Sequence, residues 1–131
     1  MLLILGDAVL SDSIKILIAE ENYVISLVLQ RMIEKLDHQC VGLATSEQEI
    51  IELTRNTTPD AIILDTSFVD AKGLKKIEKT IEAMNTSIIF SSTRKTDGIT
   101  FGTAQNSSGH YLSKPYLITD LKSEIEKIRP S

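Results

Sequence analysis

The chain has 131 residues, of which 42% are hydrophobic and 24% are charged. It is therefore long enough for one domain with a buried core, and its composition excludes disorder throughout. The net charge of −4 argues against a nucleic-acid-binding domain, which usually has a basic face. The single cysteine excludes an intramolecular disulfide, and no apolar run reaches the ~18–20 residues of a membrane helix. We expect a cytoplasmic domain with no membrane and no direct nucleic-acid contact.

Residues 1–13 differ from the rest, and we interpret them as an N-terminal extension or the end of a linker. The domain is then expected over residues 14–131. Within it, short apolar runs bounded by turns predict buried strands. In chain order, these strands are expected over residues 14–19, 40–45, 61–64, 88–91 and 111–113.

The first three helices are predicted from apolar residues at helical spacing between these strands. Asn22 is a suitable N-cap for the first. Ser46, with Glu49 three residues later, forms a capping-box pattern for the second. The third helix is expected over residues 74–84, with lysine and glutamate side chains on its outer face.

The last two connections are patterned less evenly. Residues 94–110 are polar and contain glycines, so we expect a short or irregular helix there. The final helix is expected to begin at Thr119 as its N-cap. Its apolar stripe of Leu117, Leu121 and Ile125 is expected to lie mostly in the core.

Strands that alternate with helices predict a parallel sheet with helices on both faces, a doubly wound α/β fold. In such sheets, ligands bind at the carboxyl ends of the strands. Polar residues follow four of the predicted strands, and these residues are Glu20 and Glu21, Asp65, Ser92 and Thr93, and Lys114. We expect their side chains to meet at one edge of the sheet.

The chemistry of this group favours a cation and a phosphate. Clustered carboxylates repel one another unless protons or a cation compensate. Oxygen ligands with several carboxylates suit a hard cation, with Mg²⁺ the first choice. A nearby lysine can neutralise the remaining charge and bind a phosphoryl group as a point charge.

Four segments carry a family resemblance: LIAEEN, ILDTSFVDAKG, IIFSST and YLSKP. Asp65 and Gly73 are eight residues apart, and Ser92 and Lys114 are 22 apart. In the order and spacing of these segments, the chain resembles the receiver domain of two-component response regulators over residues 14–129. The resemblance implies a flavodoxin-like, doubly wound sheet of five parallel strands in the order 2-1-3-4-5, with five flanking helices.

The resemblance also implies a phosphoacceptor and a metal site. Asp65 would accept a phosphoryl group. Glu20, Glu21 and Asp65, together with the backbone carbonyl of Ser67, would hold Mg²⁺.

Further roles implied by the resemblance concern the phosphoryl group and the switch that follows its transfer. Ser92 and Lys114 would each contact a phosphoryl oxygen. Thr93 departs from the family, which usually has a smaller residue there, and its bulk would narrow access to the phosphoryl site. Tyr111 occupies the aromatic position that turns inward on activation in many receivers. Pro115 would follow a cis peptide bond, for which an X-Pro sequence is permissive.

The partners implied are those of a signalling domain and not those of an enzyme with its own substrate. A histidine kinase or phosphotransfer protein would donate the phosphoryl group, and an unknown downstream protein would read the result. The surface expected to face partners comprises the last helix, the fifth strand and the helix before it. A homodimer, and a place within a larger regulator, are left open.

Departures from the family's usual residues motivate an alternative. The pair Glu20 and Glu21 stands where the family more often has at least one aspartate. The alternative is a degenerate receiver that acts as a phosphorylation-independent interaction module. A phosphatase of the haloacid dehalogenase type would need an aspartate at the position of Ser67, and no glycine-rich nucleotide-binding motif follows a strand.

Overall fold

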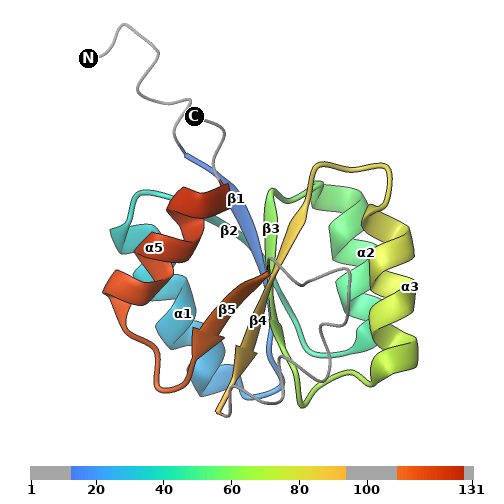
Figure 1. The fold of residues 1–131 in the computed structure, drawn as a ribbon, viewed down its shortest axis with the longest axis horizontal. Helices are drawn as coiled ribbons and strands as arrows, with labels where there is room; N and C mark the ends of the chain where they lie inside the picture. Colours follow the sequence, from blue (N-terminus) through green and yellow to red (C-terminus); the bar gives the residue numbers. More distant parts are fainter. Residues whose placement is uncertain (1–12, 94–108, 129–131) are drawn as a thin grey trace, which may run out of the picture.

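The structure is a computed structural model that describes residues 13–93 and 109–128. Within these ranges, five strands form one parallel sheet in the order β2-β1-β3-β4-β5, as expected. The strands are β1 (Lys15–Ala19), β2 (Gln39–Ala44), β3 (Ala61–Asp65), β4 (Ser87–Ser92) and β5 (His110–Ser113). Their carboxyl ends lie at one edge of the sheet, at the bottom of Figure 1.

Helices cover both faces of the sheet. In the described part of the chain they are α1 (Tyr23–Lys35), α2 (Glu47–Thr57), α3 (Ala71–Ile81) and α5 (Ile118–Ile128). Figure 1 shows α1 and α5 on one face and α2 and α3 on the other. No helix among the described residues combines the length and apolarity needed to cross a bilayer. Residues 94–108, most of the range in which a short helix is expected, and most of the expected N-terminal extension lie outside the described residues, and His110 already belongs to β5.

The helix starts follow from local hydrogen bonding. The Asn22 side chain accepts a hydrogen bond from Ile25 N at 3.2 Å, as expected of the N-cap of α1. Ser46 Oγ accepts one from Glu49 N at 3.1 Å at the start of α2. Glu49 in turn accepts from Thr45 N at 2.7 Å, so the capping box closes one residue earlier than its usual form.

Two predictions about the last helix are wrong. Helix α5 begins at Ile118, so Thr119 lies inside its first turn and is not the N-cap. The first turn instead closes on the carbonyl of Leu117, which accepts from Leu121 N at 3.1 Å. Because Leu117 precedes the helix, its side chain does not join the apolar stripe and is 58% exposed. Leu121 and Ile125 are buried as expected.

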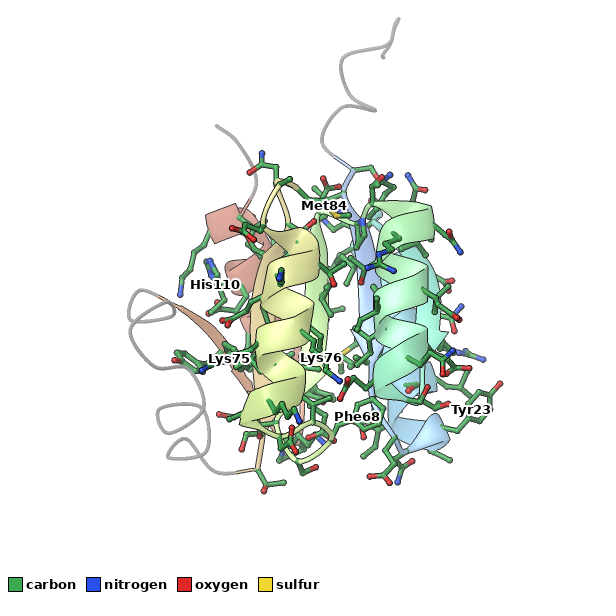
Figure 2. The ribbon with its side chains drawn as sticks, turned by 90° about the vertical axis from the view of Figure 1, so that its right-hand side faces the viewer. Tyr23, Phe68, Lys75, Lys76, Met84 and His110 are labelled. Atoms are coloured by element: carbon green, nitrogen blue, oxygen red, sulfur yellow. The ribbon has the colours of Figure 1, made fainter. Side chains whose placement is uncertain are left out.

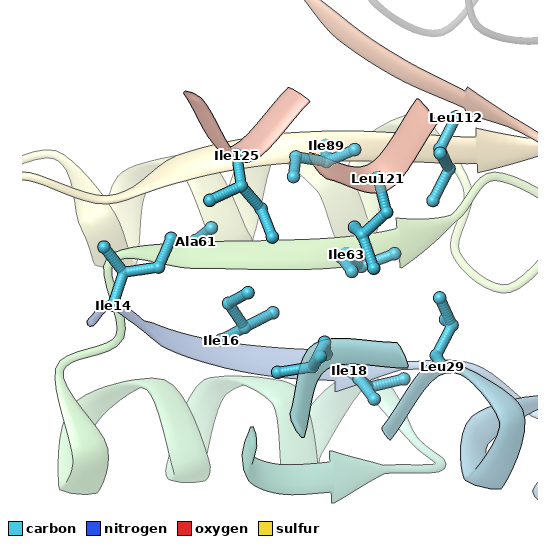
Figure 3. Packing of buried hydrophobic residues seen from close by; sticks show 11 residues of the cluster. Ile14, Ile16, Ile18, Leu29, Ala61, Ile63, Ile89, Leu112, Leu121 and Ile125 are labelled. Atoms are coloured by element: carbon cyan, nitrogen blue, oxygen red, sulfur yellow. The ribbon is translucent and has the colours of Figure 1, made fainter. Parts of the chain in front are cut away.

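The core has two layers, one on each face of the sheet, because successive side chains of a strand point to opposite faces. In β1, Ile16 and Ile18 pack beneath α1 and α5, whereas Leu17 and Ala19 pack beneath α2 and α3. Figure 3 shows the first layer, in which side chains from β1, β3 and β4 meet those of α5. The two layers fix the strands from both sides and thereby fix the positions of the residues that end them.

Candidate functional site

Three charged residues meet where β1, β3 and β5 end. Glu20 and Asp65 are only 3% and 4% exposed. The ammonium of Lys114 lies between them, with Nζ 2.9 Å from Glu20 Oε1 and 3.3 Å from Asp65 Oδ2. The other carboxylate oxygen of Glu20 accepts a hydrogen bond from Asn22 N at 3.1 Å. The strand ends thus bring together two buried carboxylates and one shared cation.

Asp65 is held in its ionised form. Burial alone would raise its pKa, but Ser67 donates to Asp65 Oδ1 from both its backbone N, at 3.1 Å, and its hydroxyl, at 2.9 Å. With the contacts to Glu20 and Lys114, these bonds bring the pKa of Asp65 below its ordinary value. At neutral pH the residue is therefore a carboxylate.

Lys114 is anchored at its backbone as well as at its ammonium. Its N donates to the carbonyl of Ser92 at 2.9 Å. Partial burial acts to lower the pKa of Lys114, but its contacts with Glu20, Tyr116 and Asp65 raise that pKa above its ordinary value. The peptide bond between Lys114 and Pro115 is cis, as the resemblance implied.

The other predicted site residues differ in burial, and most of them are exposed. Ser92 is the last residue of β4 and is buried. Strand β4 lies between β3, which ends at Asp65, and β5, which ends just before Lys114. Ser67 contributes its hydrogen bonds to Asp65 although its side chain is exposed. Glu21 and Thr93 are exposed. Across the described ranges, no three His, Cys, Asp or Glu side chains are grouped closely enough to hold a metal ion.

Tyr111, the predicted switch residue, lies near the surface of β5. Its side chain is 37% exposed. Its ring stacks against that of Phe90, with centroids 5.8 Å apart and an interplanar angle of 28°. The ring is thus outside the core while remaining in contact with β4.

One pair that sequence reasoning missed is Ser91 and Tyr116. Ser91 is fully buried, and its hydroxyl is hydrogen-bonded to the hydroxyl of Tyr116. Burial raises the pKa of Tyr116 to about 12, with the Ser91 bond and the charge of Lys114 acting in the opposite direction. A signal was available, because a tyrosine placed directly after Lys114-Pro115 needs a partner for its hydroxyl if the ring is buried.

An exposed apolar surface adjoins the site. We define the α1 patch as the large exposed side chains of the first half of α1 and the β5–α5 connection: Tyr23, Val24, Leu27, Val28 and Leu117. A surface groove of about 430 Å³ continues from it to the site, lined by Ile25, Val28, Thr93, Lys114, Pro115 and Tyr116. Figure 2 shows Tyr23 at the end of the molecule where the strands end. The α1 patch lies mainly on α1, whereas the predicted partner surface lies on α5 and β5. Leu117, in the connection between β5 and α5, is the part of the patch nearest in sequence to that predicted surface.

Comparisons with known proteins agree with this fold and identify its family. The family model described as response regulator receiver domain matches residues 16–126. The response regulator PhyR from Brucella abortus has a similar structure, with a TM-score of 0.74, 18% identity, and coverage of 92% of this chain and 51% of that one. The anti-anti-sigma factor PhyR from Bartonella quintana is also similar, with a TM-score of 0.72, 20% identity, and coverage of 88% and 47%.

A curated relative gives a shorter match. A protein-glutamate methylesterase/protein-glutamine glutaminase from Burkholderia thailandensis is 31% identical over 81 residues, which are 61% of this chain and 22% of that protein. The chain thus spans about half the length of the two similar structures and less of this relative. Since the family model covers all five strands apart from Lys15, and with them every strand end of the site, the chain belongs to the response regulator receiver domain family.

Proposed function

We propose that the chain is a phosphoryl-accepting receiver in which Asp65 takes a phosphoryl group from a histidine kinase or phosphotransfer protein. The observation that carries this proposal is the ionised carboxylate of Asp65, buried at the end of β3 and in contact with Lys114. A carboxylate in this state can attack phosphorus without a separate base to remove a proton.

In the proposed step, a carboxylate oxygen of Asp65 forms a bond to phosphorus while the bond between phosphorus and the donor's leaving group breaks. The electron pair of the broken bond stays with the leaving group, and the product is an acyl phosphate. Lys114 would neutralise charge on the phosphoryl oxygens, and the hydroxyl of Ser92 would donate to one of them. Phosphoryl transfer depends mainly on such positioning and charge neutralisation.

Mg²⁺ is the cofactor that we propose for this step. The candidate ligands are the oxygen atoms that Mg²⁺ prefers, from Glu20, Glu21, Asp65 and the backbone carbonyl of Ser67. The fit rests on the donor chemistry of Glu20 and Asp65, two buried carboxylates that follow or end the neighbouring strands β1 and β3. When bound, the metal would supply further neutralisation of the phosphoryl oxygens.

The test is the intact mass of the protein after incubation with acetyl phosphate, with and without Mg²⁺. We expect a gain of one phosphoryl group that requires Mg²⁺ and is absent in Asp65→Asn. Asp70→Asn is the matched control, because Asp70 lies in the same loop and caps α3 without contacting the site. It should be phosphorylated like the unchanged protein.

The α1 patch is the surface that we propose for the phosphoryl donor. A donor must reach Asp65, and the groove that joins the patch to Lys114 and Thr93 gives an apolar approach to that edge of the sheet. Val24→Asp should slow phosphorylation by a phosphohistidine-bearing protein while leaving phosphorylation by acetyl phosphate unchanged. Equal slowing with both donors would contradict docking at this patch.

A second candidate is an interaction module that works without phosphorylation. It is favoured by the pairing of Glu20 and Asp65 with Lys114, which neutralises the site without an added cation, and by the exposure of Glu21. Partner binding would then be a property of the unphosphorylated chain, as a structural similarity to an anti-anti-sigma factor also allows. Absence of both phosphorylation and Mg²⁺ binding, with acetyl phosphate and with phosphohistidine donors, would favour this candidate.

A further inference from the structure

The hydrogen bond between Ser91 and Tyr116 has a consequence for the neighbouring charged residues of the site. We infer that Tyr116 is a positioning residue that holds the ammonium of Lys114 between Glu20 and Asp65 through its bond to Ser91. The inference deepens the proposed function, because it assigns the group that keeps the phosphoryl-neutralising lysine in place.

Ser91 is tied to the phosphoacceptor strand. It pairs with Asp65 in the register of β3 and β4, and its carbonyl accepts a hydrogen bond from Thr66 N at 2.9 Å. Its side chain is fully buried, so the hydroxyl requires a partner inside the protein. Tyr116 supplies that partner.

Tyr116 is two residues beyond Lys114, a span of at most ~7 Å of chain. The segment between them is therefore held at both ends by neighbouring residues of β4. At one end the backbone N of Lys114 donates to the carbonyl of Ser92 at 2.9 Å, and at the other Tyr116 bonds to Ser91. This double attachment restricts the direction in which the Lys114 side chain leaves the backbone.

Packing alone does not explain why the aromatic residue at position 116 carries a hydroxyl. The aromatic ring packs against the core layer beneath α1 and α5, and a phenylalanine would fill the same space. The hydroxyl adds one specific contact, to Ser91, and remains protonated at neutral pH. Because a point charge stabilises a phosphoryl group only when it is correctly placed, loss of this contact should weaken the site more than the fold.

The first measurement is the ¹⁵N resonance of the Lys114 side chain, assigned with Lys114→Arg, in the unmodified full chain. In the unchanged protein, we expect the Lys114 resonance to be that of a partly buried, paired ammonium. In Tyr116→Phe, we expect this resonance to disappear or to shift toward the resonances of solvent-exposed lysines. The double variant Ser91→Ala/Tyr116→Phe removes both hydroxyls and leaves no unpaired buried group. It should be more stable than Tyr116→Phe and still lack the Lys114 signal. Recovery of the signal in the double variant would overturn the inference.

Thr86→Val is the matched control for removal of a hydroxyl. Thr86 donates to the carbonyl of Pro59 at 2.6 Å, at the end of the sheet opposite to the site. This variant should lower stability without changing the Lys114 signal. If the Lys114 signal changed equally in Tyr116→Phe and Thr86→Val, the change would result from general destabilisation of the fold. That result would overturn the inference.

The second measurement is the rate of phosphorylation by acetyl phosphate. Tyr116→Phe should lower it by about threefold to tenfold, the range of one ordinary hydrogen bond, and should have no further effect in a Lys114→Ala background. An equal loss of rate in the Lys114→Ala background would mean that Tyr116 acts independently of Lys114, and it would overturn the inference. If the unchanged protein takes up no phosphoryl group, the proposed function fails, while the Lys114 resonance still decides the positioning role.

Discussion

The strand interiors and the strand ends are buried alike but differ completely in chemistry. Ala19 and Leu64 are 0% exposed and pack in an apolar layer. The next residues along the chain, Glu20 and Asp65, are almost as buried and carry charges. One residue therefore separates burial that stabilises the fold from burial that must be compensated by Lys114 and by hydrogen bonds. The comparison indicates that the carboxyl edge is built for a task other than stability.

The largest expected effect on stability comes from the interior. Ile63→Ala should reduce the free energy of unfolding by about 3 kcal/mol, because it removes buried methyl groups and leaves a cavity in a layer closed on all sides. Urea denaturation measures this loss, and Ile63→Val should cost about 1 kcal/mol by the same mechanism. A loss for Ile63→Ala no larger than that of Ile63→Val would mean that the layer collapses around the cavity.

Removing the shared cation should have the next largest effect. Lys114→Met leaves the carboxylates of Glu20 and Asp65 buried without their counter-charge, and we expect a loss of about 2 kcal/mol, less than for a fully buried pair because the Lys114 side chain is 16% exposed. In Lys114→Met/Glu20→Gln, one of the two charges is gone, so much of the loss should be recovered. If the double variant is no more stable than Lys114→Met, charge compensation is not the reason for the arrangement.

The acid dependence of stability should expose the same edge. Because the fold lowers the pKa of Asp65, its ionised form contributes stability above the pKa of an unfolded aspartate, near ~3.9, and loses that contribution as pH falls through the lower folded value. The free energy of unfolding, measured from pH 7 down to about pH 2, should fall more steeply for the unchanged protein than for Asp65→Asn. Parallel curves would mean that the fold does not favour the ionised form.

The smallest effect is expected at the helix that begins beside the charged edge. Asn22→Ala removes the side-chain acceptor of Ile25 N and should cost about 1 kcal/mol, whereas Asn22→Ser should keep most of the stability. Thermal unfolding compares the two variants. A loss as large as that of Ile63→Ala would indicate that Asn22 also orders Glu20, whose Oε2 accepts from Asn22 N.

Much of the fold could be predicted from the sequence because its signals are local. Short apolar runs identified every strand to within a residue or two at each end, and Asn22 and Ser46 cap their helices through bonds to residues three positions away. The start of α5 was misplaced because Leu117 and Thr119 both fit helical spacing, and the difference depends on how the connection leaves β5. The third helix, expected over residues 74–84, spans Ala71–Ile81, because Asp70 caps it by accepting a hydrogen bond from Gly73 N.

By itself, the sequence determined the alternation of strands and helices and therefore which polar residues end the strands, because periodicity and capping act over a few residues. It also determined, through its resemblance to receivers, that Asp65 and Lys114 belong to one site. Tertiary structure decided which groups actually touch. Glu20 rather than Glu21 is buried against Lys114, and Ser91 rather than Ser92 bonds to Tyr116. These choices depend on the register of neighbouring strands and on which side chain faces the interior, where a buried polar group must find a partner.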